Sequence, residues 1–445
     1  MSKKNLIMEK IKSLWRYRLA PLLLKFSLLI NCPKLTAIIL VILIRKINHQ
    51  GDYKVLCLAR SIFMDDVRAM TIFSKKIHYL AINLSIFEMI FKYFAKETDC
   101  QNLTEGSYHS HDYCRQGKQQ YYLFLNRMIP VLQKLLGFNG VLSGNFSYVS
   151  QQEFAKVCVE KNIPFIVLYK EALVCHEFLN NYLKPCDDYS FVGTKLFPYS
   201  NKIAEALLNK GIPGLIKEKV GCIRGVPRLD FYFLNNKNGS DKTKKQVVFF
   251  SFFPKVSFRL FYLNQQQLER VEAKSLEFYR SVMKFASKHK DIKVVIKTKR
   301  ADYFIQYVKD ILSENFNENM ENLTITNIID PGELIKNSFA VMGFSSTTLI
   351  EALIAGKIII TPYFGDIFPQ GAVWDFFKEY PELVNYVRTY EDLENYILNP
   401  DRYLNYDKKI KDNFLEKYLS DSKGGASLRA EQAILDIITD SCQNY

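Results

Sequence analysis

Four hydroxyl residues stand in a row between an apolar run and a helical pattern, in the stretch GFSSTTLIEALIAGKIIITPYF from Gly343 to Phe364. A helix start needs a single capping oxygen, which Ser345 or Ser346 can supply. The surplus hydroxyls, beside the free backbone N–H groups of a helix start, suit the oxygens of a phosphate group. We therefore predict that Ser345, Ser346 and Thr347 bind phosphate, with helix capping alone as the alternative.

Glu351 follows in the same helical pattern, five or six residues after the cap. It lies beyond the first turn, where a carboxylate would serve the cap or the helix dipole. A carboxylate at this place can accept hydrogen bonds from the vicinal hydroxyls of a ribose or a sugar. We therefore interpret Glu351 as a group that binds a sugar.

Two further apolar runs end in residues that suit the same ligand. Lys297 and Arg300 close the stretch VVIKTKR, and Ser251 lies near the end of the run at 246–252. Positive charge at a strand end stabilises the charge that develops on a leaving phosphate. The alternative for the two basic residues is a solvated strand end.

One stretch in the N-terminal half of the chain contains residues that could act as a general base. The stretch FIVLYKEALVCHEF ends an apolar run with Lys170 and Glu171, and His176 follows five residues later. Group transfer to a hydroxyl needs a base that removes the hydroxyl proton. Glu171 is our first candidate for this base and His176 the second. The alternative for Glu171 is an ion pair with Lys170 or with another basic residue.

Other acidic residues near strand ends favour structural roles. Asp65 and Asp66 follow the first apolar run after residue 50, where a charge pair at a helix N-terminus is favoured over a catalytic role. Arg228 and Asp230 stand in the stretch RGVPRLDFY, close to the hinge expected between two domains. We interpret them as interdomain residues with a structural Arg–Asp pair.

The nine cysteines are odd in number and lack a framework spacing, which predicts reduced thiols in a cytoplasmic protein. Four residues could ligate zinc: Cys100, His109, His111 and Cys114. Their spacing matches no common zinc motif, so we interpret this segment as a polar loop. The adjacent aspartates of CDDY at 186–189 also lack the spacing of a metal motif. We expect neither a metal nor a cofactor.

Short apolar runs alternate with longer helical patterns along the chain after residue 50, which predicts an α/β protein with parallel sheets covered on both faces. The polar stretch NNKNGSDKTKK at 235–245 is the best linker, and the alternation restarts after it. We predict an N-terminal domain at 51–234, a C-terminal domain at 246–400, and helices at 401–445 that pack back across the domains. The runs expected as strands are 53–59, 76–82, 140–145, 163–169, 189–194, 246–252, 292–298, 323–328, 339–344 and 357–363.

Residues 1–50 carry ten basic residues and one acidic residue, out of a formal net charge of +14 for the chain. Leucine and isoleucine fill the positions between these charges, but the longest clean apolar run, Leu35 to Ile44, is too short to span a bilayer. No cleavage site of a signal peptide follows it. We predict an amphipathic segment that lies on an anionic membrane surface. The alternative is a helix packed on the protein with its basic side chains solvated. No nucleic-acid-binding signature is present.

The stretch from Gly343 to Pro362 resembles the donor-nucleotide motif of GT-B glycosyltransferases. It is most similar to the motif of bacterial surface-polysaccharide transferases related to CDP-glycerol glycerophosphotransferases and capsule β-Kdo transferases. The stretches RGVPRLDFY, VVIKTKR and YLSDSKGGASLRAEQAI resemble further motifs of these proteins in the same order. The resemblance covers roughly residues 140 to 440, and it implies that the domain at 51–234 binds the acceptor and the domain at 246–400 the nucleotide donor.

This resemblance implies two Rossmann-like doubly wound domains that face a central cleft. It also implies a metal-independent, inverting transfer of a sugar from a nucleotide-activated donor. Ser345, Ser346 and Thr347 would hold the donor phosphates, and Glu351 the ribose or the donor sugar. The implied acceptor is a lipid-linked surface polysaccharide or lipopolysaccharide at the cytoplasmic face of the inner membrane, where the protein would be peripheral.

One departure from the family decides between its activities. Glycerophosphotransferases carry a histidine near the strand end where this sequence has Thr298 and Lys299. The departure favours sugar transfer over transfer of a glycerol- or ribitol-phosphate group, which remains the alternative. A non-catalytic membrane scaffold is a third interpretation. A nucleotide-sugar epimerase would share the architecture but would not need the membrane-seeking N-terminus.

Overall fold

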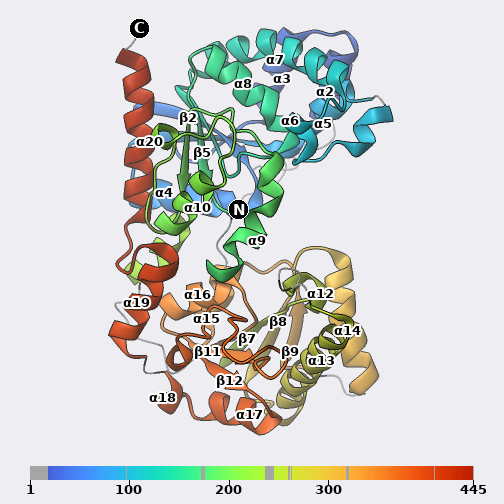
Figure 1. Ribbon diagram of the computed structural model, residues 1–445, viewed down its shortest axis with the longest axis vertical. Coiled ribbons are helices and arrows are strands. Elements are labelled where there is room, and N and C mark those ends of the chain that lie inside the picture. The colour runs from blue at the N-terminus through green and yellow to red at the C-terminus, as the bar shows by residue number, and fades with distance from the viewer. Residues whose placement is uncertain are drawn as a thin grey trace, which may run out of the picture. The chain divides into compact units, whose positions relative to one another are not determined.

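The computed structural model describes residues 19–96, 98–171, 176–235, 245–258, 261, 263–316, 320–404 and 406–443 (Figure 1). The chain forms two compact units. Unit 1 takes its described residues from 19–171, 183–230 and 425–443, and unit 2 from 176–182 and 231–424. The change from unit 1 to unit 2 falls after Asp230, a few residues before the predicted linker. The chain returns to unit 1 twice, at Leu183 after the short segment 176–182 and again at Gly425.

Unit 1 is built on a six-stranded sheet with the order β1-β3-β2-β4-β5-β6. Its pairs are parallel except that of the edge strand β1, which runs antiparallel to β3. Because β3 lies on one side of β2 and β4 on the other, the chain reverses its direction of winding between β2 and β4. The strands are β1 (Arg45–Lys46), β2 (Tyr53–Ala59), β3 (Ile77–Asn83), β4 (Gly140–Ser143), β5 (Phe165–Tyr169) and β6 (Lys195–Pro198).

The last strand of unit 1 corrects one sequence prediction. We expected a strand at 189–194, but β6 begins at Lys195, and Thr194 instead accepts a hydrogen bond from the Phe165 N–H at its hydroxyl, at 3.0 Å. The segment before it folds around Phe191, whose ring fills the space beside Gly193. An apolar run was therefore the sign of a buried loop here and not of a strand.

Helices cover the sheet of unit 1. Helix α3 packs against α7 and α2, and α20 packs against α4. The described part of the N-terminal segment is thus docked on unit 1, and residues 1–18 lie outside the described residues. None of the helices in the described ranges combines the length and apolar content that a membrane crossing requires. The main helices are α2 (Ala20–Leu29), α3 (Pro33–Leu43), α4 (Ser61–Phe73), α5 (Leu84–Phe94), α7 (Arg115–Leu136), α8 (Gln152–Glu160), α10 (Asn201–Asn209) and α20 (Ala426–Gln443).

Unit 2 is built on a parallel six-stranded sheet with the order β12-β11-β10-β7-β8-β9. In chain order this is 6-5-4-1-2-3, the doubly wound arrangement of dinucleotide-binding domains, with its reversal between β7 and β10. The strands are β7 (Gln246–Phe250), β8 (Lys293–Lys297), β9 (Leu323–Thr326), β10 (Ala340–Met342), β11 (Ile358–Pro362) and β12 (Asn385–Val387). The main helices are α13 (Gln265–Lys288), α14 (Asp302–Asn315), α15 (Pro331–Asn337), α16 (Thr347–Ile354), α17 (Tyr390–Leu398) and α19 (Lys408–Leu419).

The predicted fold class is confirmed. Each unit is a doubly wound α/β domain with a parallel sheet, and two such domains in one chain are the domain composition of the GT-B fold. These strands appear in the sequence as continuous apolar runs because both faces of each parallel sheet are buried. A strand buried on both faces does not alternate polar and apolar residues.

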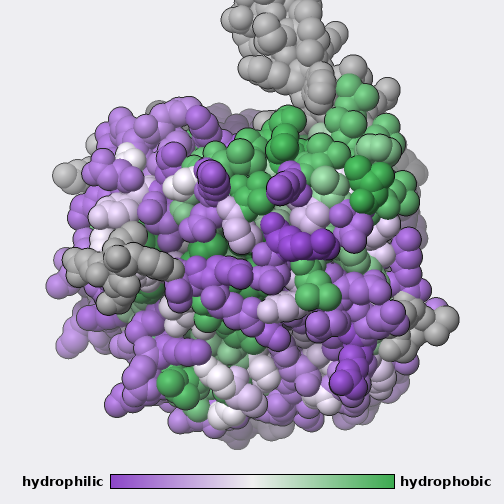
Figure 2. Space-filling model, turned by 90° about the horizontal axis from the view of Figure 1, so that it is seen from above, coloured by the Kyte–Doolittle hydropathy of each residue, from purple (hydrophilic) through white to green (hydrophobic). Residues whose placement is uncertain are grey.

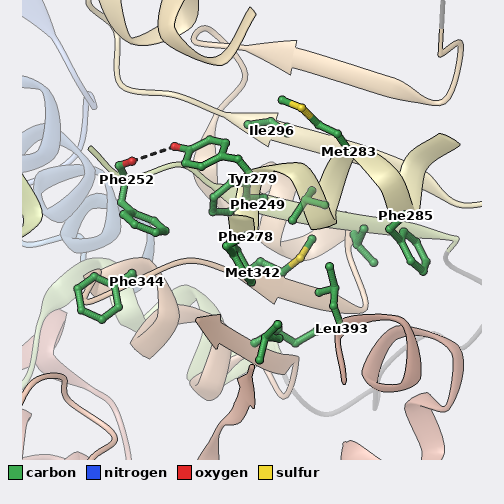
Figure 3. Packing of buried hydrophobic residues seen from close by; sticks show 14 of the residues in the cluster. Phe249, Phe252, Phe278, Tyr279, Met283, Phe285, Ile296, Met342, Phe344 and Leu393 are labelled. Carbon is green, nitrogen blue, oxygen red and sulfur yellow. Dashed lines mark hydrogen bonds between the residues drawn. The ribbon is translucent and has the colours of Figure 1, made fainter. Parts of the chain in front are cut away.

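Aromatic side chains fill the core of unit 2 and fix the end of β10 (Figure 3). Phe344 follows β10 directly and is buried, with its ring stacked on Phe258 at 4.5 Å between centroids. Tyr279 on α13 donates a hydrogen bond to the Phe252 carbonyl just after β7, at 2.8 Å. The residues that follow β7 and β10 are therefore held by packing, which limits how far they can move.

The prediction of reduced thiols is wrong for two cysteines. Cys100 and Cys114 form a disulfide that closes the loop before α7. This bond removes both sulfurs as zinc ligands, and His109 bonds Gln152 instead, at 2.9 Å. Nowhere in the described part of the chain do three His, Cys, Asp or Glu side chains gather so as to hold a metal ion. Free thiols in the described ranges are Cys32, Cys57, Cys158, Cys186 and Cys222.

Asp230 does not pair with Arg228, which corrects the expected Arg–Asp pair. Its buried carboxylate accepts the backbone N–H groups of Gly425, Ala426 and Ser427, at 2.8, 3.2 and 2.7 Å. It therefore caps α20 from almost two hundred residues away in sequence. Gly425 has φ +84°, a left-handed conformation that glycine adopts without strain.

Arg228 instead binds Asp66, and both lie within unit 1. Its guanidinium donates to both carboxylate oxygens of Asp66 at 3.2 Å, and its backbone N–H donates at 3.1 Å. The hydroxyl of Tyr199 donates a further bond to Asp66, at 2.5 Å. Asp66 is fully buried in α4, whereas Asp65 is half-buried and pairs with Arg68. Asp66 is thus a structural carboxylate in mid-helix, not part of a charge pair at a helix start.

Replacing Asp230 with alanine should destabilise unit 1 by about 3 kcal/mol, because three backbone N–H groups lose a buried charged acceptor. Urea unfolding followed by circular dichroism measures the loss, and hydrogen exchange should speed up in α20. The matched control is Asp112→Ala, which removes an exposed carboxylate that pairs with Arg115 at 3.9 Å and should cost less than about 1 kcal/mol. Equal stability of the two variants would show that Asp230 does not hold α20.

Candidate functional site

The hydroxyl cluster of the sequence forms the turn between β10 and α16. Ser346 is the N-cap, with its hydroxyl accepting the Thr348 N–H at 3.3 Å and lying 2.8 Å from the Thr348 hydroxyl. Of the two predicted caps, Ser346 is the one observed. Capping accounts for Ser346 and Thr348 but leaves the hydroxyls of Ser345 and Thr347 without that explanation.

Ser345 has an unusual backbone. Its φ of +43° lies in the left-handed region, which costs a residue with a side chain roughly 1 kcal/mol. Glycine would relieve this strain, yet the sequence has serine here and glycine two residues earlier. Such strain in a loop after a strand is a recurrent property of binding sites.

The strand register places three of the predicted strand ends at one edge of the sheet of unit 2. Met342 of β10 pairs with Phe249 of β7, and Phe250 of β7 pairs with Lys297 of β8. Ser251, Lys297 and the turn at 343–346 therefore lie at the carboxyl ends of three adjacent parallel strands. The reversal of winding falls between β7 and β10, which is where doubly wound sheets bind ligands.

Lys297 lies at this edge with a buried side chain. Its ammonium donates to the carbonyl oxygens of Thr298 at 2.8 Å and Asn327 at 3.0 Å. Burial lowers the pKa of this ammonium, and the charge of Arg300 lowers it further. Two of its three donors are thus engaged by the protein, and Lys297 stabilises the strand ends as well as supplying charge.

Ser251 and Arg300 lie at the same edge with different exposure. The Ser251 N–H donates to the Lys297 carbonyl at 2.9 Å. The Arg300 side chain is exposed, and its carbonyl accepts from Asn327 at 3.2 Å. Ser251 therefore joins the hydrogen bonds that fix the strand ends, whereas Arg300 presents its charge to solvent.

Glu351 lies in α16 and is buried, with 8% of its surface exposed. The hydroxyl of Tyr232 donates to one of its oxygens at 3.2 Å. A buried carboxylate in an otherwise apolar helix is costly unless polar groups bind it. Glu351 thus combines a tyrosine partner with a place one turn behind the hydroxyl cluster.

The two predicted bases belong to different units, Glu171 to unit 1 and His176 to unit 2. Glu171 follows β5, and its carboxylate forms an ion pair with the ammonium of Lys170. The ring of His176 lies 4.9 Å from that of Tyr418, between centroids. The observed ion pair of Glu171 is the structural alternative that the sequence left open.

A polar cluster that the sequence did not reveal lies after β4 in unit 1. The Ser147 hydroxyl donates to the carboxylate of Glu105 at 2.9 Å, and the Ser147 N–H donates to the Asn145 side chain, also at 2.9 Å. Tyr189 senses the charge of Glu105. Burial, and next the Glu105 charge, raise the pKa of Tyr189 to about 12, so that its hydroxyl stays protonated.

Arg60 adds a positive charge to this cluster. It follows β2, and its guanidinium lies over the ring of Tyr148 at 4.3 Å and 3.6 Å from the Glu88 carboxylate. Partial burial lowers the pKa of Arg60, but the bond to Tyr148 and the charges of Glu88 and Glu105 outweigh burial and raise it. Because β2 and β4 flank the winding reversal of unit 1, this cluster occupies the position in unit 1 that the hydroxyl cluster occupies in unit 2.

Unit 2 has a hollow on the side of β10 that faces away from β7, so it lies apart from the predicted residues. It is bounded by α13 and by the ends of β11 and β12, and includes Lys274, Tyr363 and Arg388. The Arg388 guanidinium stacks over the Tyr363 ring at 3.4 Å. None of the predicted site residues lines this hollow.

Comparison with known proteins adds a likeness of fold at low identity. No family model matches the sequence, and no curated protein matches it. S. aureus MnaA, in a structure with UDP, has 12% identity over 87% of this chain and 98% of its own, with a TM-score of 0.47. The UDP-GlcNAc 2-epimerase of Neisseria meningitidis, bound to UDP-GlcNAc, has 12% identity over 86% and 100%, with a TM-score of 0.45.

A third solved structure is an α,α-trehalose 6-phosphate synthase from Burkholderia multivorans. It has 10% identity over 89% of this chain and 98% of its own, with a TM-score of 0.42. Identities and scores this low leave the chemistry of this chain to its own residues.

Two substitutions in the turn should change the stability of unit 2 in opposite directions. Ser345→Gly removes left-handed strain and should stabilise unit 2 by about 1 kcal/mol, whereas Ser346→Ala removes the N-cap and should destabilise it by about 1 kcal/mol. Urea unfolding in a Trp15→Phe background measures both, because Trp374, buried in unit 2, is then the single tryptophan. A loss of stability in Ser345→Gly would show that the serine side chain has a structural role.

Proposed function

We propose that the protein is a glycosyltransferase that moves a sugar from a nucleotide-activated donor to a glycan acceptor without a metal and with inversion. The observation that carries the proposal is the convergence of Ser251, Lys297 and the strained Ser345 turn at the winding reversal of the unit 2 sheet. Hydroxyls, a helix start and basic side chains at this position suit a diphosphate.

Different residues of unit 2 would bind different parts of the donor. The α16 N–H groups and the hydroxyls of Ser345 and Thr347 would bind the diphosphate, and Arg300 would add charge as the bond to the sugar breaks. Lys297 would keep the strand ends in place. Glu351, with Tyr232, would hold the hydroxyls of the ribose or of the donor sugar.

A carboxylate of unit 1 would act as the base. The acceptor hydroxyl attacks the anomeric carbon and passes its proton to this carboxylate, while the nucleotide leaves with the electrons of the broken bond. We place Glu105 ahead of Glu171 because it lies at the winding reversal, whereas the Glu171 carboxylate is paired with Lys170. His176 is the third candidate.

The proposed acceptor is a lipid-linked surface polysaccharide or lipopolysaccharide at the cytoplasmic face of the inner membrane. The basic and apolar composition of residues 1–50 supports a peripheral place at that face. Transfer of a glycerol- or ribitol-phosphate group is the second candidate, on the same donor site. Glycerophosphotransferases carry a histidine near the strand end where this chain has Thr298. Thr298 is buried, and its hydroxyl donates to the Lys299 carbonyl at 3.0 Å, so this side chain supplies no titratable group in place of that histidine.

Nucleotide binding tests the donor site. Purified protein should gain thermal stability with one of the nucleotides UDP, GDP, CDP and CMP, and with the nucleotide sugars that carry this nucleotide. Ser346→Ala and Glu351→Gln should each weaken this gain by about tenfold in ligand concentration. Their exposed counterparts on α14, Ser313→Ala and Glu314→Gln, should leave it unchanged.

The absence of any shift across the panel would refute a nucleotide-dependent enzyme. A shift with CDP-glycerol or CDP-ribitol alone would favour the polyol-phosphate transferase. Conversion of the bound nucleotide sugar without an acceptor would instead identify an epimerase.

The choice of base is tested by two isosteric substitutions. Glu105→Gln should lower kcat by about a hundredfold or more and leave nucleotide affinity unchanged, because Glu105 belongs to unit 1. Glu171→Gln should lower kcat by less than about tenfold, because its carboxylate is paired with Lys170. Turnover measured against pH should lose its acidic limb in Glu105→Gln only. The reverse pattern would assign the base to Glu171.

A further inference from the structure

Helix α2 is apolar on both of its faces. Ala20, Leu24 and Leu28 point into unit 1 and are buried. A helix that is apolar all round lies in a protein core or in contact with lipid. The opposite face of α2 is a stripe of large apolar side chains, all of them exposed: Leu19, Leu22, Leu23, Phe26, Leu29 and Ile30.

Helix α3 continues this apolar surface. Ile38 and Ile42 are exposed by 49% and 47%, one turn apart on the helix, while Leu40 and Leu43 are buried. Eight of the eighteen exposed large apolar side chains in the described residues therefore fall within residues 19–42. Figure 2, which views this end of unit 1, shows apolar residues gathered in one patch. Clustering of this kind marks a contact surface rather than ordinary surface residues.

The hairpin is anchored so that this face stays outward. The buried hydroxyls of Ser27 and Thr36 lie 2.8 Å apart and join the two helices. Pro33 begins α3, and α3 packs along α7. The exposed stripe is therefore carried by a rigid part of unit 1 and cannot fold inward without breaking this packing.

The charged side chains of the hairpin and of the residues that follow it to position 51 are all basic. Lys25 and Lys34 are exposed on the two helices, and Arg45 and Lys46 are exposed just after α3. No aspartate or glutamate occurs between residues 19 and 51. Arg127 of α7 reaches the turn of the hairpin, where its guanidinium lies 3.5 Å from the Asn31 side chain. An apolar face on helices whose charged residues are all basic complements an anionic lipid surface.

We propose that the α2–α3 hairpin docks unit 1 on an anionic phospholipid bilayer, with its apolar stripe at the level of the acyl chains and its basic residues at the headgroups. Ten and eleven residues of helix reach about 15 Å, half of a bilayer core, so the hairpin lies in one leaflet. This inference rests on the membrane contact of the proposed function, and it is independent of the transferase activity.

Co-sedimentation of the full chain with lipid vesicles tests the inference. The protein should bind vesicles of phosphatidylcholine with phosphatidylglycerol and bind those of phosphatidylcholine alone at least about tenfold more weakly. The triple variant Leu22→Ser, Phe26→Ser, Leu29→Ser should lose binding by about tenfold or more. The pair Lys25→Gln, Lys34→Gln should weaken binding to the anionic vesicles only.

A matched triple variant controls for the removal of apolar surface. Ile72→Ser, Ile216→Ser and Leu428→Ser change side chains of unit 1 that are exposed by 57%, 54% and 54%, close to the 62%, 54% and 68% of the test residues. It should bind as the unaltered protein does. All variants keep residues 1–18, so a loss confined to the test variant comes from the hairpin.

Three outcomes would overturn the inference: equal binding by the test and control variants, no binding by the unaltered protein, or equal binding to both kinds of vesicle. Light scattering identifies a different occupant. A dimer of the unaltered protein that the test variant alone breaks, with vesicle binding unchanged, would make this face an interface between copies. A nucleotide-induced thermal shift in the same preparation reports on the donor site. It therefore distinguishes a failure of membrane docking from a failure of the proposed transferase function.

Discussion

The parallel pairing of β7 with β8 on one side and β10 on the other is the constraint on which the candidate donor site depends. It alone brings together residues that lie almost a hundred positions apart, and it places the N-terminus of α16 beside them. The aromatic core supports this pairing at the point where it matters. Phe344 and Phe252 are buried directly after β10 and β7, so that the polar residues following them begin from fixed positions.

Unit 1 depends in the same way on a few buried polar contacts. Asp66 and Asp230 are both carboxylates with several donors each, and neither is exposed enough to meet a substrate. Apart from Tyr199, their partners belong to the motifs RGVPRLDFY and GGASLR, which the sequence suggested as features of a family of transferases. In this structure the two motifs contact each other: the Arg429 guanidinium donates to the Arg224 carbonyl, and the Ser427 hydroxyl donates to that of Pro227 at 3.1 Å. A motif shared by many proteins can therefore reflect a structural contact between two segments and not a catalytic group.

The sequence predicted the α/β class, the two domains and most of the strands, because buried parallel strands and amphipathic helices leave local patterns. It also predicted Ser346 as a cap from the residues beside it. It could not predict the strand order, the partner of Asp230 or the disulfide of Cys100 and Cys114, since these are contacts between distant segments. Glu105 was missed for the same reason. It lies in a polar loop with no strand before it, and only the fold carries it to Ser147. Asn145, at the end of a predicted strand, was the signal that could have pointed there.

The return of α20 to unit 1 sets the order in which the chain can finish folding. The ribosome releases the described residues of unit 2 before Ala426, so Asp230 waits for its backbone partners until that whole unit has been made. Most of unit 2 lies in one continuous stretch, 231–424, in which local contacts can close first; only 176–182 join it from the first half of the chain. Unit 1 must hold its sheet together in the meantime without its last helix, with the surface of α4 that α20 will cover still open. Newly made chains should therefore be most exposed to proteases and chaperones on unit 1, although it is the unit that begins synthesis first.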